Sequence, residues 1–91
     1  MKHAGTEALA KLQTILKALR SRSCLVERTP GSFYLKSKAF VHFHEDPSGL
    51  FADLKDNLVS FTRYRVTSRT EQRDLVERVE KCLANAVKGK S

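Results

Sequence analysis

Residues 39–66, AFVHFHEDPSGLFADLKDNLVSFTRYRV, decide the fold, because they hold three strand-like runs separated by turn-forming residues. The runs cover residues 39–44, 50–55 and 59–66, and residues 45–49 between the first two predict a hairpin loop. Asp56 and Asn57 predict a two-residue hairpin turn, since both tolerate a positive φ. Strands joined by such short connections must be antiparallel.

Two more strand-like runs precede this stretch, at residues 24–29 and 32–36. Pro30 and Gly31 separate them and match a type II turn, in which proline fixes one φ and glycine supplies a positive one. The sequence therefore predicts a sheet of four or five antiparallel strands.

A helix is predicted on either side of these strands, each with one apolar stripe at helical spacing. The first covers residues 6–21, with Thr6 as its N-cap. The second begins with a capping box formed by Ser68 and Glu71. The stripe of the first helix comprises Leu9, Leu12, Ile15, Leu16 and Leu19, and that of the second comprises Leu75, Val76, Val79, Cys82, Leu83, Ala86 and Val87.

The order helix, strands, helix predicts an α+β fold. Two helices with one apolar stripe each require one apolar sheet face to cover, so we expect a two-layer sandwich with both helices on the same face. Its 91 residues, of which 41% are hydrophobic, suit one domain, with residues 1–5 and 89–91 disordered. Neither a membrane span nor a secretory signal is expected.

The net charge of +7 favours acidic partners such as nucleic acid or another anionic ligand. Cys24 and Cys82 are far apart and form no CxxC pair, which excludes a zinc-finger site. We expect two reduced thiols in a cytosolic protein, with one long-range disulfide as the alternative.

The sheet face away from the helices is predicted to combine aromatic residues with cations. Such a face suits three roles: stacking single-stranded nucleic acid, forming a sheet-to-sheet homodimer, or lying under loops of the chain itself. A register slip of one residue would exchange the two faces. The predicted residues of the open face are Phe40, His42, His44, Phe51, Asp53, Lys55, Phe61, Arg63 and Arg65.

His42 and His44 point to the same side of their strand, because side-chain direction repeats every two residues. With Asp53 on the next strand, they make a candidate set of ligands for a divalent metal ion, and structural histidines are the alternative. The same residues would carry any hydrolytic role.

A second candidate is an anion or nucleic-acid site where the last strand leads into a helix N-terminus. Ordinary capping beside solvated arginines is the alternative. Its residues are Lys55, Arg63, Arg65, Ser68 and Arg69. The sequence contains no Walker loop, GxGxxG, GxSxG or HExxH motif, and we expect no cofactor.

Residues 31–40, GSFYLKSKAF, and residues 49–55, GLFADLK, resemble part of the small bacterial MmcQ/YjbR-like proteins. That family has a strand of the form F-x-h-x-x-K-x-F and a hairpin that ends in a lysine, here Lys55. The resemblance covers about a third of the chain. It implies a frataxin-like fold and a bacterial cytosolic setting, and it transfers no catalytic residue.

The sequence thus predicts a non-enzymatic binding or interaction domain, homodimeric through its open sheet face. A nucleic-acid-binding protein is the first alternative. A metal-binding or hydrolytic protein that uses His42 and His44 is the second.

Overall fold

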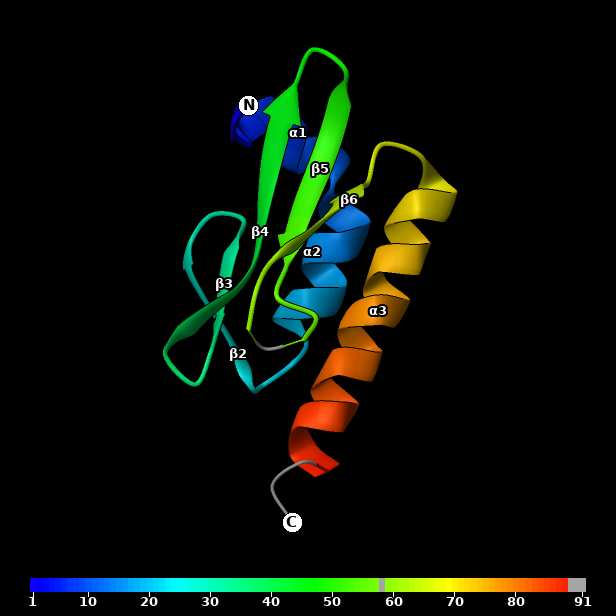
Figure 1. Cartoon of the computed structure of the whole chain (residues 1–91). Helices are drawn as coiled ribbons and strands as arrows, with labels where there is room; N and C mark the ends of the chain where they lie inside the picture. Colours follow the sequence, from blue (N-terminus) through cyan, green and yellow to red (C-terminus); the bar gives the residue numbers. More distant parts are fainter. Residues whose placement is uncertain (58, 89–91) are drawn as a thin grey trace.

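The chain folds into a sheet layer and a helix layer (Figure 1). The structure is a computed structural model, and it describes residues 1–57 and 59–88. Five strands form an antiparallel meander in the order β2-β3-β4-β5-β6, and a further short strand, β1, pairs with β4. The elements are β1 (Lys2–His3), α1 (Thr6–Lys11), α2 (Gln13–Arg20), β2 (Leu25–Thr29), β3 (Ser32–Leu35), β4 (Lys38–Asp46), β5 (Gly49–Leu54), β6 (Thr62–Arg65) and α3 (Arg69–Lys88).

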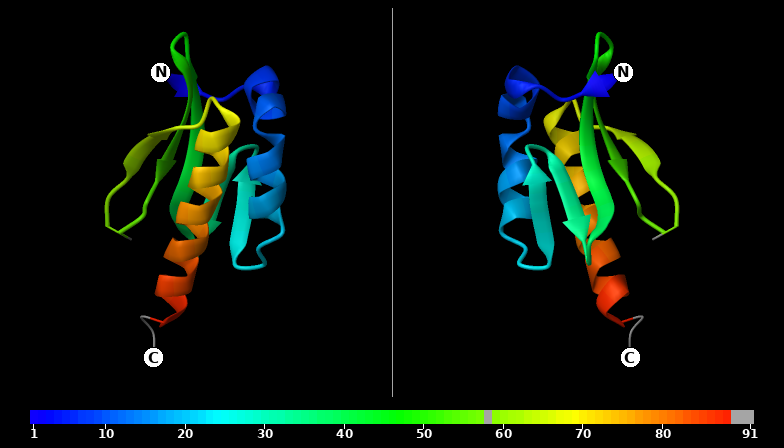
Figure 2. Two further views of the ribbon diagram at one scale, coloured as in Figure 1. Left: turned by 90° about the vertical axis from the view of Figure 1, so that its right-hand side faces the viewer. Right: turned by 90° about the vertical axis from the view of Figure 1, so that its left-hand side faces the viewer.

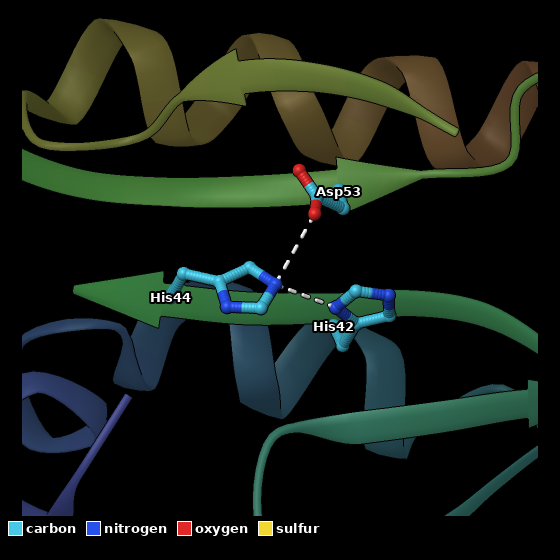
Figure 3. A group of neighbouring side chains, drawn as sticks. All are labelled: His42, His44 and Asp53. Atoms are coloured by element: carbon cyan, nitrogen blue, oxygen red, sulfur yellow. Dashed lines mark hydrogen bonds and ion pairs between the residues drawn. The ribbon is translucent and has the colours of Figure 1, made fainter. Parts of the chain in front are cut away.

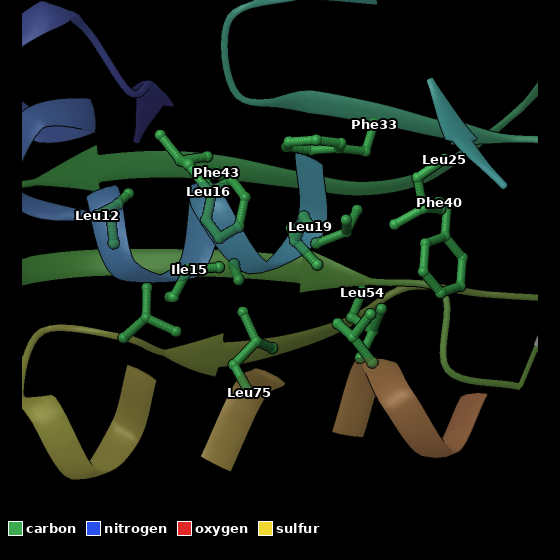
Figure 4. Packing of buried hydrophobic residues seen from close by; sticks show 14 of the residues in the cluster. Leu12, Ile15, Leu16, Leu19, Leu25, Phe33, Phe40, Phe43, Leu54 and Leu75 are labelled. Atoms are coloured by element: carbon green, nitrogen blue, oxygen red, sulfur yellow. The ribbon is translucent and has the colours of Figure 1, made fainter. Parts of the chain in front are cut away.

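The helices α2 and α3 lie side by side on one face of the sheet, which confirms the α+β sandwich (Figure 2). The core fills the space between the layers, where alternate residues of β4 and β5 meet the stripes of the helices (Figure 4). Its side chains are largely apolar, so their removal from water provides the main stabilisation of the fold. In the described part of the chain, no helix is long and apolar enough to cross a membrane.

The prediction of one helix over residues 6–21 is wrong, because the helix is interrupted at Leu12. This residue has φ −104° and ψ 14°, and its N–H donates to the carbonyl of Leu9 at 3.0 Å, a tight i→i−3 turn. The predicted N-cap is also wrong: Gly5 takes that position, and its N–H donates to Oε2 of Glu45 at 2.6 Å. A tertiary contact with Glu45 thus accompanies the start of the helix, and no proline or glycine marks the break at Leu12.

The predicted disorder of residues 1–5 is corrected by β1, in which Lys2 lies opposite Glu45 and His3 opposite His44. The N–H of Ala4 also donates to the carbonyl of Phe43 at 3.0 Å. Two residues are too short to show a strand pattern, so no sequence signal predicts this pairing. Residues 89–91 and the side chain of Val87 lie outside the described residues.

Phe40 is buried in the core, so its prediction as an open-face residue is wrong. The pairing of β3 with β4 shifts register between Phe33 and Tyr34, which is the signature of a β-bulge. The bulge places two successive residues, Phe40 and Val41, in the core. Alternation resumes after it, so His42 and His44 keep the predicted side.

The connection between β5 and β6 covers residues 55–61 and is longer than the predicted two-residue turn at Asp56 and Asn57. The side-chain carbonyl of Asn57 accepts hydrogen bonds from the N–H groups of Val59 and Ser60, at 2.9 and 2.8 Å. Asn57 therefore organises a wider loop through its side chain. In consequence β6 begins at Thr62, three residues later than predicted.

The predicted capping box of Ser68 and Glu71 and the predicted turn at Pro30 and Gly31 are both confirmed. Oγ of Ser68 accepts from the N–H of Glu71 at 3.1 Å, and Oε1 of Glu71 accepts from the N–H of Ser68 at 2.9 Å. Gly31 has φ +80°, the value that a type II turn requires after Pro30. Local sequence signals therefore fix the start of α3 and the β2–β3 hairpin.

The turn between β3 and β4 gives the first testable prediction. Lys36 and Ser37 have φ of 53° and 71°, a left-handed conformation that costs a non-glycine residue about 1–2 kcal/mol. Ser37→Gly should therefore raise the free energy of unfolding, by about 1 kcal/mol, in urea denaturation. Ser23 is exposed and does not have a positive φ, so Ser23→Gly should lower the free energy of unfolding. An equal effect of both variants would contradict the assignment of strain to this turn.

Candidate metal site on the open sheet face

Histidine and aspartate side chains from adjacent strands meet on the sheet face away from the helices (Figure 3). His42 in β4 lies opposite Asp53 in β5, and Asp53 lies opposite Arg63 in β6. Val41 and Phe43, the neighbours of His42, are buried in the core, so strand alternation directs His42 and His44 to the other face. The structure therefore brings together all three residues predicted as metal ligands.

The possible ligand atoms of these residues all lie within 4.8 Å of one another. Nδ1 of His42 lies 2.8 Å from Nε2 of His44, and that nitrogen lies 3.2 Å from Oδ2 of Asp53. Cis ligands about 2.0–2.1 Å from one ion are separated by about 3 Å, so these contacts are on the scale of a shared metal. Nε2 of His44 lies at the centre of the group.

The short separations between these three atoms require a proton or a metal ion between them. Nδ1 of His42, Nε2 of His44 and Oδ2 of Asp53 each carry a lone pair in their unprotonated forms, and lone pairs this close repel one another. One proton on Nε2 of His44 would serve the other two atoms. A divalent cation would replace that proton and satisfy all three lone pairs.

Arg63 holds the carboxylate of Asp53 in place. Its Nε and Nη2 donate to Oδ1 and Oδ2 at 2.7 and 2.9 Å, a bidentate pairing. This pairing lowers the pKa of Asp53, against the opposing effect of burial, so the group is ionised at neutral pH. Metal-ligating carboxylates are commonly oriented by such outer partners.

Both imidazoles are neutral at pH 7. Burial lowers the pKa of His42, with a further contribution from the charge of His44, while Asp53 opposes the shift. Burial is also the main cause that lowers the pKa of His44, again against Asp53. Because a metal ion binds only the neutral imidazole, this environment keeps the donor atoms available.

The shifts predict an acid-dependent loss of stability in protein freed of metal by a chelator. Unfolded histidines protonate near pH 6.5, whereas His42 and His44 in the folded state do so only at lower pH. Between these pKa values the unfolded state binds more protons, so the free energy of unfolding falls as the pH falls.

Urea denaturation at pH 7.5, 6.5 and 5.5 measures this dependence. The groups that face the two rings are His3, Asp53 and Arg63, and His3 is retained throughout. The double variant His42→Gln/His44→Gln should show a flatter pH profile. An unchanged slope in that variant would assign the acid sensitivity to other groups.

The predicted aromatic and basic surface is smaller than expected. Phe61 is exposed, with its ring 4.9 Å from that of His42 and 5.0 Å from Nζ of Lys55. Phe51 lies on this face but is half-buried, and Phe40 is in the core. The surface therefore offers one exposed aromatic ring from the predicted three.

The predicted anion site at the start of α3 is filled by a carboxylate of the chain itself. Glu71 accepts from the N–H groups of Thr67 and Ser68 and pairs with Arg65. Arg69 faces elsewhere, with Arg73, along a groove between α2 and α3. The structure thus does not bring the five predicted anion-site residues together.

Sulfate should therefore give no specific stabilisation. The melting temperature in millimolar sodium sulfate should equal that in sodium chloride at matched ionic strength, because Glu71 already accepts from the N–H groups of Thr67 and Ser68 and pairs with Arg65. A sulfate-specific increase that disappears in Arg65→Ala would show instead that the anion displaces Glu71.

One residue of the site was missed by the sequence analysis. The ring of His3, in β1, lies 5.2 Å from that of His44 and 5.9 Å from that of His42, measured between centroids. Its approach depends on the β1–β4 pairing, which joins residues about 40 positions apart. The only available signal was that His3 is one of three histidines in the chain.

Comparison with protein-family models, curated proteins and solved structures found no match to this chain. The resemblance to MmcQ/YjbR-like proteins, with the bacterial and cytosolic setting that it implies, stays a prediction.

Proposed function

We propose that this chain is a binding domain whose open sheet face takes up one divalent transition-metal ion through His42, His44 and Asp53. The observation that supports this proposal is the convergence of two imidazole nitrogens and one carboxylate oxygen from two adjacent strands. Two histidines and one carboxylate form a borderline-soft set that suits zinc, and they leave coordination positions for a further ligand.

The surroundings of the three donors support the same function. The side chains of His44 and Asp53 are 14% and 13% exposed, so bulk water competes weakly while an ion can still reach the site from the open face. Arg63 orients the carboxylate, and both imidazoles are neutral at pH 7. The three donors already lie close together, so small side-chain movements suffice to place them around one ion, and little entropy is lost on binding.

Calorimetric titration with zinc at pH 7.5 tests the proposal. Protein freed of metal should bind one zinc ion per chain with micromolar or tighter affinity. Magnesium should give no heat, because it prefers oxygen ligands. At pH 5 the zinc affinity should fall sharply as the imidazoles protonate. Absence of zinc binding at pH 7.5 would refute the proposed function.

The two other expected functions receive less support from the geometry. A homodimer through the open face would cover charged groups, including Arg63 and Arg65, and a nucleic acid would have to compete with Asp53 and Glu71 for these arginines. Both functions stay predictions. Salt separates them, since affinity for nucleic acid falls steeply as salt rises, whereas an apolar contact changes little.

A further inference from the structure

We propose that His3 is a fourth ligand of the same metal site, and that metal binding therefore fastens the N-terminal strand β1 to β4. This inference rests on the proposed function. The pairing of β1 with β4 brings His3 opposite His44, so this strand of two residues would help to bind the metal ion as well as extend the sheet.

The separations of the three imidazole rings support this assignment. Imidazoles that share one tetrahedral zinc ion through bonds of about 2.0–2.1 Å have ring centroids about 5 Å apart. In the structure the centroids of His42 and His44 are 4.8 Å apart, those of His3 and His44 5.2 Å, and those of His3 and His42 5.9 Å. The three rings thus already have the spacing of a shared ion.

The position of His3 allows its nitrogen to reach the other donors. The group of atoms within 4.8 Å consists of His42, His44 and Asp53, so the imidazole of His3 must turn to join it. His3 is exposed, and rotation about its Cβ–Cγ bond turns the ring nitrogens while the ring centroid stays close to its present position. Three imidazoles and one carboxylate then give the four donors that tetrahedral zinc takes.

Because β1 pairs with β4 over only two residues, one added bond should markedly increase the stability of this pairing. Two residue pairs connect it to β4, supported by the ion pair of Lys2 with Glu45 and by the hydrogen bond from Gly5 to the same side chain. Short terminal elements open with little free energy in the absence of other constraints. A metal bond through His3 would link β1 to β4 and β5, and would slow this opening.

The test combines zinc calorimetry with amide hydrogen exchange on the full chain. His3→Ala should weaken zinc binding by at least about tenfold, because one of four proposed donors is lost. Zinc should slow exchange of the amides of residues 2–5 in the wild-type protein and have no such effect in His3→Ala. Thr6→Ala, at an exposed position three residues further along the chain, is the control, and it should bind zinc with wild-type affinity.

The outcomes separate this inference from the proposed function. Wild-type zinc affinity in His3→Ala, together with lost binding in His44→Ala, would refute the role of His3 and leave the three-residue site intact. Unchanged exchange of residues 2–5 upon zinc binding would refute the fastening of β1. Absence of zinc binding by the wild-type protein would refute both proposals.

Discussion

Leu12→Asp should unfold the domain. Leu12 lies at the interruption between α1 and α2 and is 0% exposed within the shared core. The described residues of the core cluster around it are apolar, so a carboxylate there would be buried without a partner from that cluster, which costs several kcal/mol. That cost is comparable with the whole stability of a small domain, about 5–10 kcal/mol.

Circular dichroism and amide NMR dispersion measure this effect. Gln13→Asp is the matched control, because the next residue is exposed and the same charge there remains in water. Leu83→Asp should unfold the protein in the same way from α3, with exposed Ala84→Asp as its control. Folded, soluble variants at both Leu12 and Leu83 would contradict one core shared by the helices and the sheet.

His44→Ala should lower zinc affinity more than any other single substitution in the site, by at least about a hundredfold. Its Nε2 is the atom that approaches both other donors, at 2.8 Å from His42 and 3.2 Å from Asp53. Removal of this imidazole therefore leaves two donors without a common neighbour. His42→Ala should also abolish tight binding, although it leaves the contact between His44 and Asp53.

Calorimetry on the variants checks this order, and circular dichroism checks that each is folded. Asp53→Asn removes a charged ligand while preserving its shape, so it should weaken binding, whereas Asp74→Asn on exposed α3 should not. Equal zinc affinity in wild type, His44→Ala and Asp53→Asn would place the metal elsewhere on the chain.

Much of the fold follows from local sequence patterns. The apolar stripe after Ser68, its capping box with Glu71, and the turn at Pro30 and Gly31 each have a short-range physical cause, so they were predictable. The pairing of His42 with Asp53 followed from period-two alternation in two adjacent strands, once the hairpin between them was recognised.

The features that escaped prediction depend on contacts between distant residues. The bulge that buries Phe40 is a property of the β3–β4 pairing, and the strand that contains His3 exists only because β4 offers it an edge. The anion site was not predictable because Glu71, the acidic residue of the capping box, accepts from the N–H groups of Thr67 and Ser68 just before the helix. The sequence predicted Arg65 as an anion-binding residue from its position before the helix, although it is paired with Glu71.

The central claim is that one divalent ion binds at the meeting point of His42, His44 and Asp53. Anomalous scattering at the zinc absorption edge, from crystals grown with equimolar zinc, tests it most directly. We predict one strong anomalous peak about 2 Å from Nδ1 of His42, Nε2 of His44 and a carboxylate oxygen of Asp53. Crystals that contain zinc with no peak at these three atoms, or with the peak at Cys24, would contradict it.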